Sequence, residues 1–262
     1  MTTYRDQAVV LRKLDYGEAD RIYTLLTREH GKVGAIAKGV RKTSSRLAHA
    51  LGLYAHVDVL LAHGRNLDVV AQASLLPGTR LAAEVERTAH AALIAELAER
   101  VTEDRHPVEG IYELTVLALE ELAREAQPRR ASAYFLSQAL DLLGYAPQLS
   151  DCAACGQLLE PVPSAFSPAA GGFLCMDCAA VSGGVNPGPP ESRQTFWGGG
   201  MMLISVAALK VLRLMAAGEI GLYRRLRLEA AVLLEVETVL EAQLEHHLDR
   251  RLKSLQFLRS MR

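Results

Sequence analysis

The chain has 262 residues, of which 50 % are hydrophobic and 23 % are charged, and its formal net charge is −1. It is long enough for two or three small domains with hydrophobic cores. No run of about eighteen apolar residues occurs, which excludes a membrane-spanning helix. The first residues lack the apolar core of a secretion signal, and we therefore expect a cytoplasmic protein.

The near-zero net charge hides an uneven distribution along the chain. Residues 1–80 hold 12 Lys and Arg against 7 Asp and Glu, a net charge of +5, and residues 210–262 hold 10 against 7, a net charge of +3. Residues 81–150 and 151–209 are acidic, with net charges of −6 and −3. A basic beginning, an acidic middle and a basic end predict a molecule with a cationic face.

The first eighty residues predict five short β-strands. Turn residues separate the hydrophobic runs, and the alternation is clearest from Leu53 to Leu61, where the odd-numbered residues share one face. The expected strands are residues 7–14, 21–27, 33–37, 53–61 and 67–76. Such a series predicts a small closed barrel. An oligonucleotide-binding (OB) fold is the commonest such barrel with a cationic face, although an SH3-like barrel has the same periodicity.

Beyond residue 84 the hydrophobic period changes to that of helices. Pro107 is placed to start one helix and Pro128 to end it. Gly144 is placed to close the next helix and Ser205 to cap the one after. The expected helices are residues 85–101, 107–127, 132–143, 205–217 and 233–252. We therefore predict an α+β multidomain protein, with a barrel at residues 1–79 and a helical domain at residues 80–262.

The four cysteines of the chain lie in two C-x-x-C pairs, Cys152 with Cys155 and Cys175 with Cys178. Each pair allows two thiolates to reach one ion from a tight turn, and two pairs complete the tetrahedron of a closed structural zinc site. Because sulfur fills all four positions, such a site supports the fold and leaves no place for a substrate. Residues 150–180 are therefore expected to form a zinc-finger loop inserted in the helical domain.

Other states of the cysteines stay open. Iron also accepts four thiolates, and the same residues could form two disulfides or remain free thiols. The chain shows no mark of an oxidising compartment, which favours a metal. Zinc would also supply the folding energy that a loop rich in proline and glycine lacks.

Signatures of nucleotide-binding and hydrolytic enzymes are missing. The chain has no G-x-x-x-x-G-K-[ST], G-x-G-x-x-G, G-x-S-x-G or H-E-x-x-H motif, so we do not expect an enzyme. Residues 182–200 are rich in glycine and proline and predict a linker or surface loop without regular structure. Within it, Phe196 and Trp197 are expected to be buried by folding back.

The positive charge of the first eighty residues concentrates in one segment. No Asp or Glu occurs from residue 30 to residue 57. Cations neutralise phosphates, and hydroxyl groups and backbone amides between them donate to phosphate oxygens, so the pattern predicts nucleic-acid binding. The expected contact residues are Lys32, Lys38, Arg41, Lys42 and Arg46, with Arg65 in a nearby hairpin turn. A solvated flexible loop and a surface for an acidic protein are the alternatives.

A second basic cluster, Arg224, Arg225 and Arg227, precedes the last expected helix. Cations near the end of a helix also complement its dipole, so DNA contact and ordinary surface are equally good interpretations. Tyr23 and Tyr54 are the aromatic residues nearest the first basic segment that could stack on bases. With so few aromatic residues, binding should depend mainly on the nucleic-acid backbone and on salt.

Short segments along the whole chain form a recognisable series. They are Ala8–Leu11, Asp15–Arg21, Leu26–Lys32, Ala37–Lys42, Leu142–Tyr145, Cys152–Gly156, Phe166–Pro168 and Leu252–Ser254. In this order they resemble the bacterial recombination mediator family RecO. The family's DNA surface carries over to the matching positions Lys32, Lys38, Arg41 and Lys42, whereas Arg46 and Arg65 follow from charge and turn placement alone.

The resemblance implies an N-terminal OB-fold, a helical domain that carries the cysteine loop, and no covalent chemistry. It implies a role in recombinational DNA repair: annealing complementary strands and helping to load the strand-exchange recombinase onto single strands coated by single-strand-binding protein. The implied partners are single- and double-stranded DNA, RecR and the C-terminal tail of single-strand-binding protein, in a protein near the nucleoid that is a monomer when alone.

Three other functions stay open. One is a zinc-ribbon transcriptional regulator whose cysteine loop contacts DNA, against which the absence of Lys and Arg from Cys152 to Cys178 argues. The others are an enzyme with an unrecognised site and a protein–protein adaptor.

Overall fold

The computed structural model describes residues 2–78, 81, 84–183, 196–197, 200–248 and 251–261. The chain divides into two compact units. The first unit comprises Met1–Phe135 with Leu252–Arg262, and the second comprises Leu136–Arg251. Among the described residues, no helix combines the length and hydrophobicity needed to cross a membrane.

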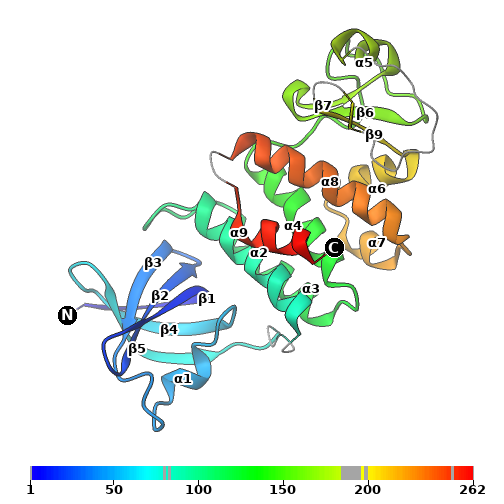
Figure 1. Cartoon of the computed structure of the whole chain (residues 1–262). Helices are drawn as coiled ribbons and strands as arrows, with labels where there is room; N and C mark the ends of the chain where they lie inside the picture. Colours follow the sequence, from blue (N-terminus) through cyan, green and yellow to red (C-terminus); the bar gives the residue numbers. More distant parts are fainter. Residues whose placement is uncertain are drawn as a thin grey trace. The chain divides into compact units, whose positions relative to one another are not determined.

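The first unit begins with a closed five-stranded barrel (Figure 1). Its strands are β1 (Thr3–Tyr16), β2 (Asp20–Thr27), β3 (Gly31–Ala37), β4 (His56–Ala62) and β5 (Asp68–Leu75). Their order around the barrel is β1-β2-β3-β5-β4, and β4 pairs with β1 to close it. Neighbouring strands are antiparallel except β3 and β5, which are parallel. This connectivity is that of an OB-fold, so the predicted barrel is confirmed.

Alternation along the strands fills the barrel interior. Val57, Val59 and Leu61 are fully buried, as the sequence predicted. Leu53 was expected on the same face but is 36 % exposed. The reason is that β4 begins only at His56, after Tyr54 turns the backbone with a positive φ of 63°. A period of two can direct side chains only where the backbone is extended.

The helices of the first unit follow the barrel and return at the end of the chain. They are α1 (Leu47–Ala50), α2 (Val85–Val101), α3 (Ile111–Arg124), the first half of α4 (Pro128–Leu142) and α9 (Lys253–Ser260). The predicted helix start at Pro107 is wrong. Gly110 has a φ of 79°, which is not helical geometry, and α3 begins only after it. Pro128 does not end a helix but begins α4, where its missing N–H costs nothing.

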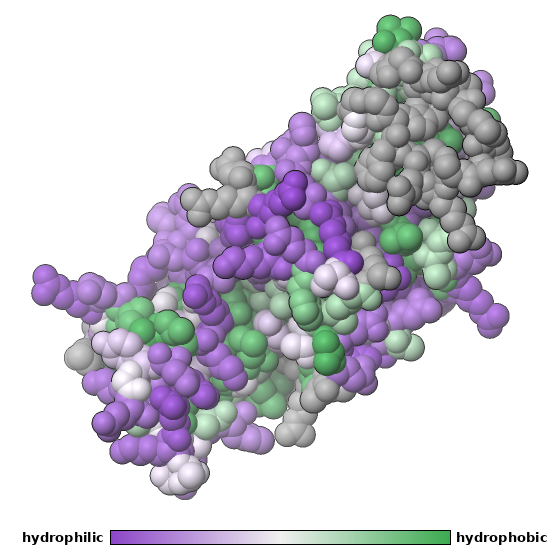
Figure 2. Space-filling model, in the orientation of Figure 1, coloured by the Kyte–Doolittle hydropathy of each residue, from purple (hydrophilic) through white to green (hydrophobic). Residues whose placement is uncertain are grey.

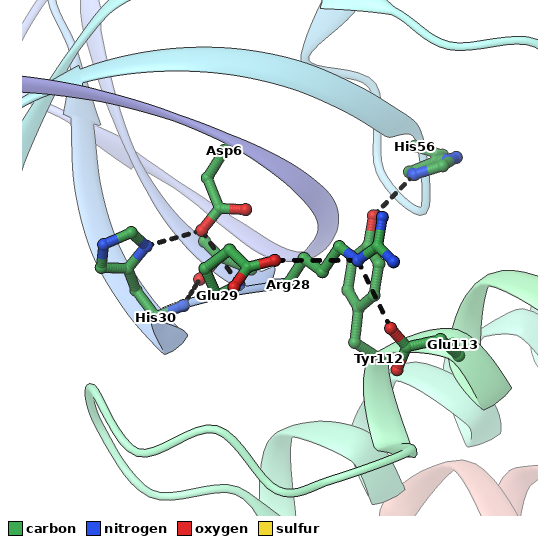
Figure 3. A network of polar contacts seen from close by, with 8 residues as sticks. Asp6, Arg28, Glu29, His30, His56, Tyr112 and Glu113 are labelled. Atoms are coloured by element: carbon green, nitrogen blue, oxygen red, sulfur yellow. Dashed lines mark hydrogen bonds and ion pairs between the residues drawn. The ribbon is translucent and has the colours of Figure 1, made fainter.

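Figure 3 shows polar contacts that fasten the start of α3 to the barrel. His56, at the start of β4, shares a hydrogen bond of 2.8 Å with the hydroxyl of Tyr112. Burial lowers the pKa of His56, which keeps its ring neutral in this contact. Arg28, after β2, lies 3.5 Å from the carboxylate of Glu113. The barrel and these helices thus form one compact unit, and the boundary after residue 79 stays a prediction.

The expected long helix at residues 233–252 is present but ends about five residues earlier than predicted, and a separate helix follows it in the other unit. α8 (Ala230–His247) ends at Leu248, whose ψ of 128° is extended, and α9 starts after Leu252. Glu96 on α2 accepts hydrogen bonds from the first residues of α9. Its carboxylate accepts the N–H of Lys253 at 3.0 Å, the N–H of Ser254 at 2.8 Å and the Ser254 hydroxyl at 2.6 Å. A distant side chain thus takes the capping role that α9 lacks locally.

Glu96→Ala should lower the free energy of unfolding by about 1 kcal/mol, the usual cost of removing a helix cap. Burial raises the pKa of the Glu96 carboxyl, but the hydrogen bonds from Ser254 and Lys253 outweigh it and lower that pKa. The carboxylate is therefore the form that caps α9. Urea unfolding measures the loss, and Glu109→Ala, an exposed loop change in the same unit, is the control. An equal loss in both variants would contradict the capping role.

The second unit combines helices with a small sheet. The helices are the second half of α4, α5 (Met176–Gly183), α6 (Val206–Ala216), α7 (Ile220–Arg225) and α8. The sheet has the order β7-β6-β9-β8, from β7 (Gly172–Leu174), β6 (Ser164–Ser167), β9 (Met201–Ile204) and β8 (Phe196–Trp197). The predicted caps are confirmed: Ser205 accepts the N–H of Ala208 at 3.2 Å, and Gly144 follows α4 with a φ of 75°.

The glycine- and proline-rich segment differs from its prediction in one respect. Phe196 and Trp197 form β8, which pairs with β9, so part of the segment has regular structure. The expected burial of these two side chains, like residues 184–195 and 198–199, lies outside what the structure describes.

Candidate nucleic-acid interface and metal centre

Most of the predicted nucleic-acid contacts lie on the surface of the barrel. Lys38, Arg41, Lys42 and Arg46 are exposed between β3 and α1, and we call these four residues the basic loop. Arg65 is exposed in the turn between β4 and β5. The face of the barrel shown in Figure 2 is largely hydrophilic, with hydrophobic residues among the polar ones.

Backbone hydrogen bonds hold the basic loop against the β1–β2 turn. The N–H of Arg41 donates to the carbonyl of Ala19 at 2.9 Å, and the N–H of Gly39 donates to the carboxylate of Asp20 at 2.7 Å. Within the loop, the N–H of Lys42 donates to the Gly39 carbonyl at 3.1 Å, which the positive φ of Gly39 (65°) permits. The cations therefore project from a folded turn.

Lys32 has surroundings that the sequence did not reveal. Its ammonium donates to the carbonyls of Glu99 and Thr102 at the end of α2, at 3.2 and 2.7 Å, and lies 3.6 Å from Asp104. The side chain is only 20 % exposed. A cation in this place satisfies carbonyls that have no partner within the helix and complements its dipole. Lys32 thus joins β3 to α2, and this placement does not support its predicted contact with DNA.

The predicted stacking residues are wrong. Tyr23 is fully buried in the core of the barrel, and Tyr54 is only 9 % exposed. Tyr16, which the sequence reading passed over, is 55 % exposed at the end of β1. Its position directly before Gly17 in a hairpin turn was the available signal, since a turn between strands extends beyond the core.

The second basic cluster lies in the second unit. Arg224 and Arg225 are exposed in the last turn of α7, and Arg227 is exposed just after it. Arg224 and Arg225 therefore complement the dipole of α7, in agreement with the interpretation of this cluster as ordinary surface. Contact with DNA at this cluster stays a prediction.

The four cysteines meet in the second unit, as predicted. Their sulfur atoms all lie within 4.8 Å of one another, and those of Cys155 and Cys175 are 3.9 Å apart. Zinc–sulfur bonds of about 2.3 Å in a tetrahedron would place the sulfurs about 3.8 Å apart. Cys152 and Cys155 flank a turn, whereas Cys175 follows β7 and Cys178 lies in the first turn of α5.

The protonation of the thiols also suits a cation. Burial raises the pKa of Cys152, but N–H groups of Cys155, Cys175 and Ala154 that point at its sulfur outweigh burial and lower the pKa to about 6. Hydrogen bonding with the thiols of Cys175 and Cys155 raises the pKa of Cys178 to about 12. An ionised Cys152 thus disfavours ionisation of Cys178. A bound divalent ion would stabilise the thiolate form of all four cysteines. The residues fit a structural metal ion.

Comparisons with known proteins agree with the fold. Residues 1–78 match the family model described as Recombination protein O N terminal, and residues 82–197 match Recombination protein O C terminal. Among the similar proteins are three named DNA repair protein RecO. The one from Roseiflexus sp. (strain RS-1) is 38 % identical over 99 % of this chain and 86 % of its own length.

The second relative, from Nocardioides sp. (strain ATCC BAA-499 / JS614), is 37 % identical over 97 % of this chain and 98 % of its own length. The third, from Dehalococcoides mccartyi (strain ATCC BAA-2266 / KCTC 15142 / 195), is 32 % identical over 98 % of this chain and 96 % of its own length. With both family models matched in order on an OB-fold and a helical region, the chain belongs to the RecO family of DNA repair proteins.

Proposed function

We propose that the protein binds single- and double-stranded DNA through the basic loop and Arg65. The observation that carries the proposal is the exposure of all five cations on an OB-fold, four of them in a segment that has no acidic residue from residue 30 to residue 57. Lys and Arg at this density neutralise phosphates and release counterions whatever the base sequence. The membership in a DNA repair family supports the same ligand.

In recombinational repair, this surface would anneal complementary strands. Two strands repel each other through their phosphates, and cations that hold the backbones lower this repulsion while the bases stay free to pair. Together with RecR and the C-terminal tail of single-strand-binding protein, the protein would help load the strand-exchange recombinase onto coated single strands. It acts by binding, without covalent chemistry, as a monomer when alone.

The cysteine cluster, in this proposal, holds one structural zinc ion. Four thiolates leave no coordination site for water or substrate, so the ion stabilises the loop and takes no part in a reaction. The loop itself is a poor DNA ligand, because Cys152–Cys178 contains no Lys or Arg. This composition disfavours the zinc-ribbon regulator.

A salt titration of single-stranded DNA binding tests the main proposal. If four or five phosphates are neutralised, the logarithm of the binding constant should fall with the logarithm of salt concentration with a slope of about −3. Fluorescence anisotropy of a labelled oligothymidylate measures it. A protein–protein adaptor would bind the strand weakly or with an affinity that salt does not change, and either result would refute the proposed function.

A further inference from the structure

The four cysteines differ in their access to solvent. Cys155 is exposed, Cys175 and Cys178 are half-buried, and Cys152 is only 2 % exposed. A thiolate reacts with a dissolved reagent only where the reagent can reach its sulfur atom. Among the four ligands of the proposed metal site, Cys155 is therefore the one most open to chemical attack.

Hydrogen bonding adds to this difference. The sulfur of Cys152 accepts the N–H of Cys175 at 3.3 Å and also faces the N–H groups of Cys155 and Ala154. The sulfur of Cys155 faces the N–H of Gln157. Hydrogen bonds that stabilise a thiolate also lower its nucleophilicity. Burial and backbone N–H groups thus both protect Cys152, whereas exposure leaves Cys155 reactive.

A second sulfur lies close to that of Cys155. The sulfur atoms of Cys155 and Cys175 are 3.9 Å apart, so they would have to approach by about 2 Å to form a disulfide. Cys155 belongs to the first C-x-x-C pair and Cys175 to the second, so this bond would remove one ligand from each pair. A closed structural zinc site uses four ligands, and the two remaining thiolates would hold the ion only weakly.

The charge of the loop selects the kind of oxidant. Cys152–Cys178 contains no Lys or Arg, Asp177 is exposed and Asp151 is half-buried. Negative charge repels anionic reagents such as glutathione disulfide, and it does not repel a small neutral molecule. The loop therefore favours hydrogen peroxide, which is small and uncharged.

We propose that Cys155 is a site of oxidation by hydrogen peroxide and that Cys175 completes a disulfide with it. The Cys155 thiolate attacks one oxygen of the peroxide, the O–O bond breaks, hydroxide leaves, and Cys155 becomes a sulfenic acid. The Cys175 thiolate then attacks the Cys155 sulfur, the S–S bond forms, the S–O bond breaks, and a second hydroxide leaves. The two sulfurs together lose the two electrons that the peroxide gains.

This oxidation would release the metal ion and loosen the second unit, an inference that rests on the proposed structural zinc. The basic loop lies in the first unit, so DNA binding should persist at temperatures below unfolding. A thiol reductant cleaves a disulfide, so the change is reversible when zinc is present.

The experiment treats the zinc-loaded protein, freed of reductant, with hydrogen peroxide while a chromogenic chelator measures released zinc. Dimedone should trap a sulfenic acid at Cys155, and mass spectrometry of peptides should find the Cys155–Cys175 disulfide. Glutathione disulfide at the same concentration should release zinc more slowly. Reductant with added zinc should restore the metal content.

Two histidine variants form a matched pair, because three cysteines and one histidine also bind structural zinc. Cys155→His should keep the metal and release it about tenfold more slowly in peroxide, since the exposed thiolate is gone. Cys178→His retains Cys155 and Cys175 and should release zinc at the rate of the unaltered protein. If Cys155→His does not hold zinc, the dimedone and disulfide mapping of the unaltered protein decides the proposal.

A first sulfenic acid at another cysteine, a disulfide that lacks Cys155, or equal release rates in the two histidine variants would overturn the proposal. So would full retention of zinc at a peroxide concentration that oxidises free glutathione in the same buffer. Absence of any metal from the protein before treatment would instead refute the proposed zinc site. The two failures are therefore distinguishable.

Discussion

Reversing both charges in Arg41→Glu/Lys42→Glu should lower the affinity for single- and double-stranded DNA by on the order of a hundredfold at low salt. Two cations that neutralise phosphates are lost and two repelling carboxylates replace them. The slope of the salt titration should flatten by about 1.4 for single strands, which is the share of two phosphate contacts. Anisotropy titrations at several salt concentrations measure both effects.

Three further variants make this result specific. Arg41→Lys/Lys42→Arg keeps the charge of the basic loop and should keep most of the affinity. Lys210→Glu reverses an exposed charge in the second unit and should change binding little. Arg41 also lies 3.6 Å from Asp15, so its replacement could disturb the fold. Lys42→Glu alone leaves this ion pair intact and should give about half of the loss in binding free energy. Unchanged affinity of the double reversal at low salt would remove the basic loop from the interface.

Replacing Cys152 by serine should release the metal and lower the melting temperature by about 10 °C or more, since structural zinc supplies many kcal/mol of folding energy. Cys152 is the most buried of the four ligands, so serine would leave both a vacant ligand position and a buried hydroxyl. Elemental analysis should find one zinc ion per chain in the unaltered protein and none in the variant. Thermal unfolding measures the stability.

The control for the metal site is Ala154→Ser, an exposed change between two ligands that should keep the metal and the melting temperature. The cations of the basic loop lie in the first unit and the cysteines in the second, so Cys152→Ser should keep its DNA affinity at temperatures below its own unfolding. Iron in the elemental analysis would correct the identity of the ion. A metal-free protein whose serine variant melts normally would refute the structural site.

Local patterns predicted the elements that depend on local chemistry. Alternation between turn residues predicted the barrel strands, because a pleated strand sends every second side chain inward whatever its neighbours are. Ser205 and Gly144 predicted helix ends, since a cap bonds the backbone beside it. The helix boundaries predicted from Pro107 and Pro128 were wrong, because proline allows more than one position near a helix end. Proline is tolerated both before a helix and in the first turn of a helix. The sequence alone did not show that Pro107 lies before α3 or that Pro128 lies in the first turn of α4.

The sequence by itself determined that two C-x-x-C pairs would meet, because one structural metal ion needs four thiolates, and that the basic loop would stay at the surface, because charged side chains are rarely buried. Only the tertiary structure decided that Lys32 bonds the end of α2 and that Glu96 starts a new helix at Lys253. It also decided that Tyr23 is buried in the core of the barrel. Each of these outcomes depends on which segment, distant in the sequence, packs against the residue, and a local pattern carries no information about that partner.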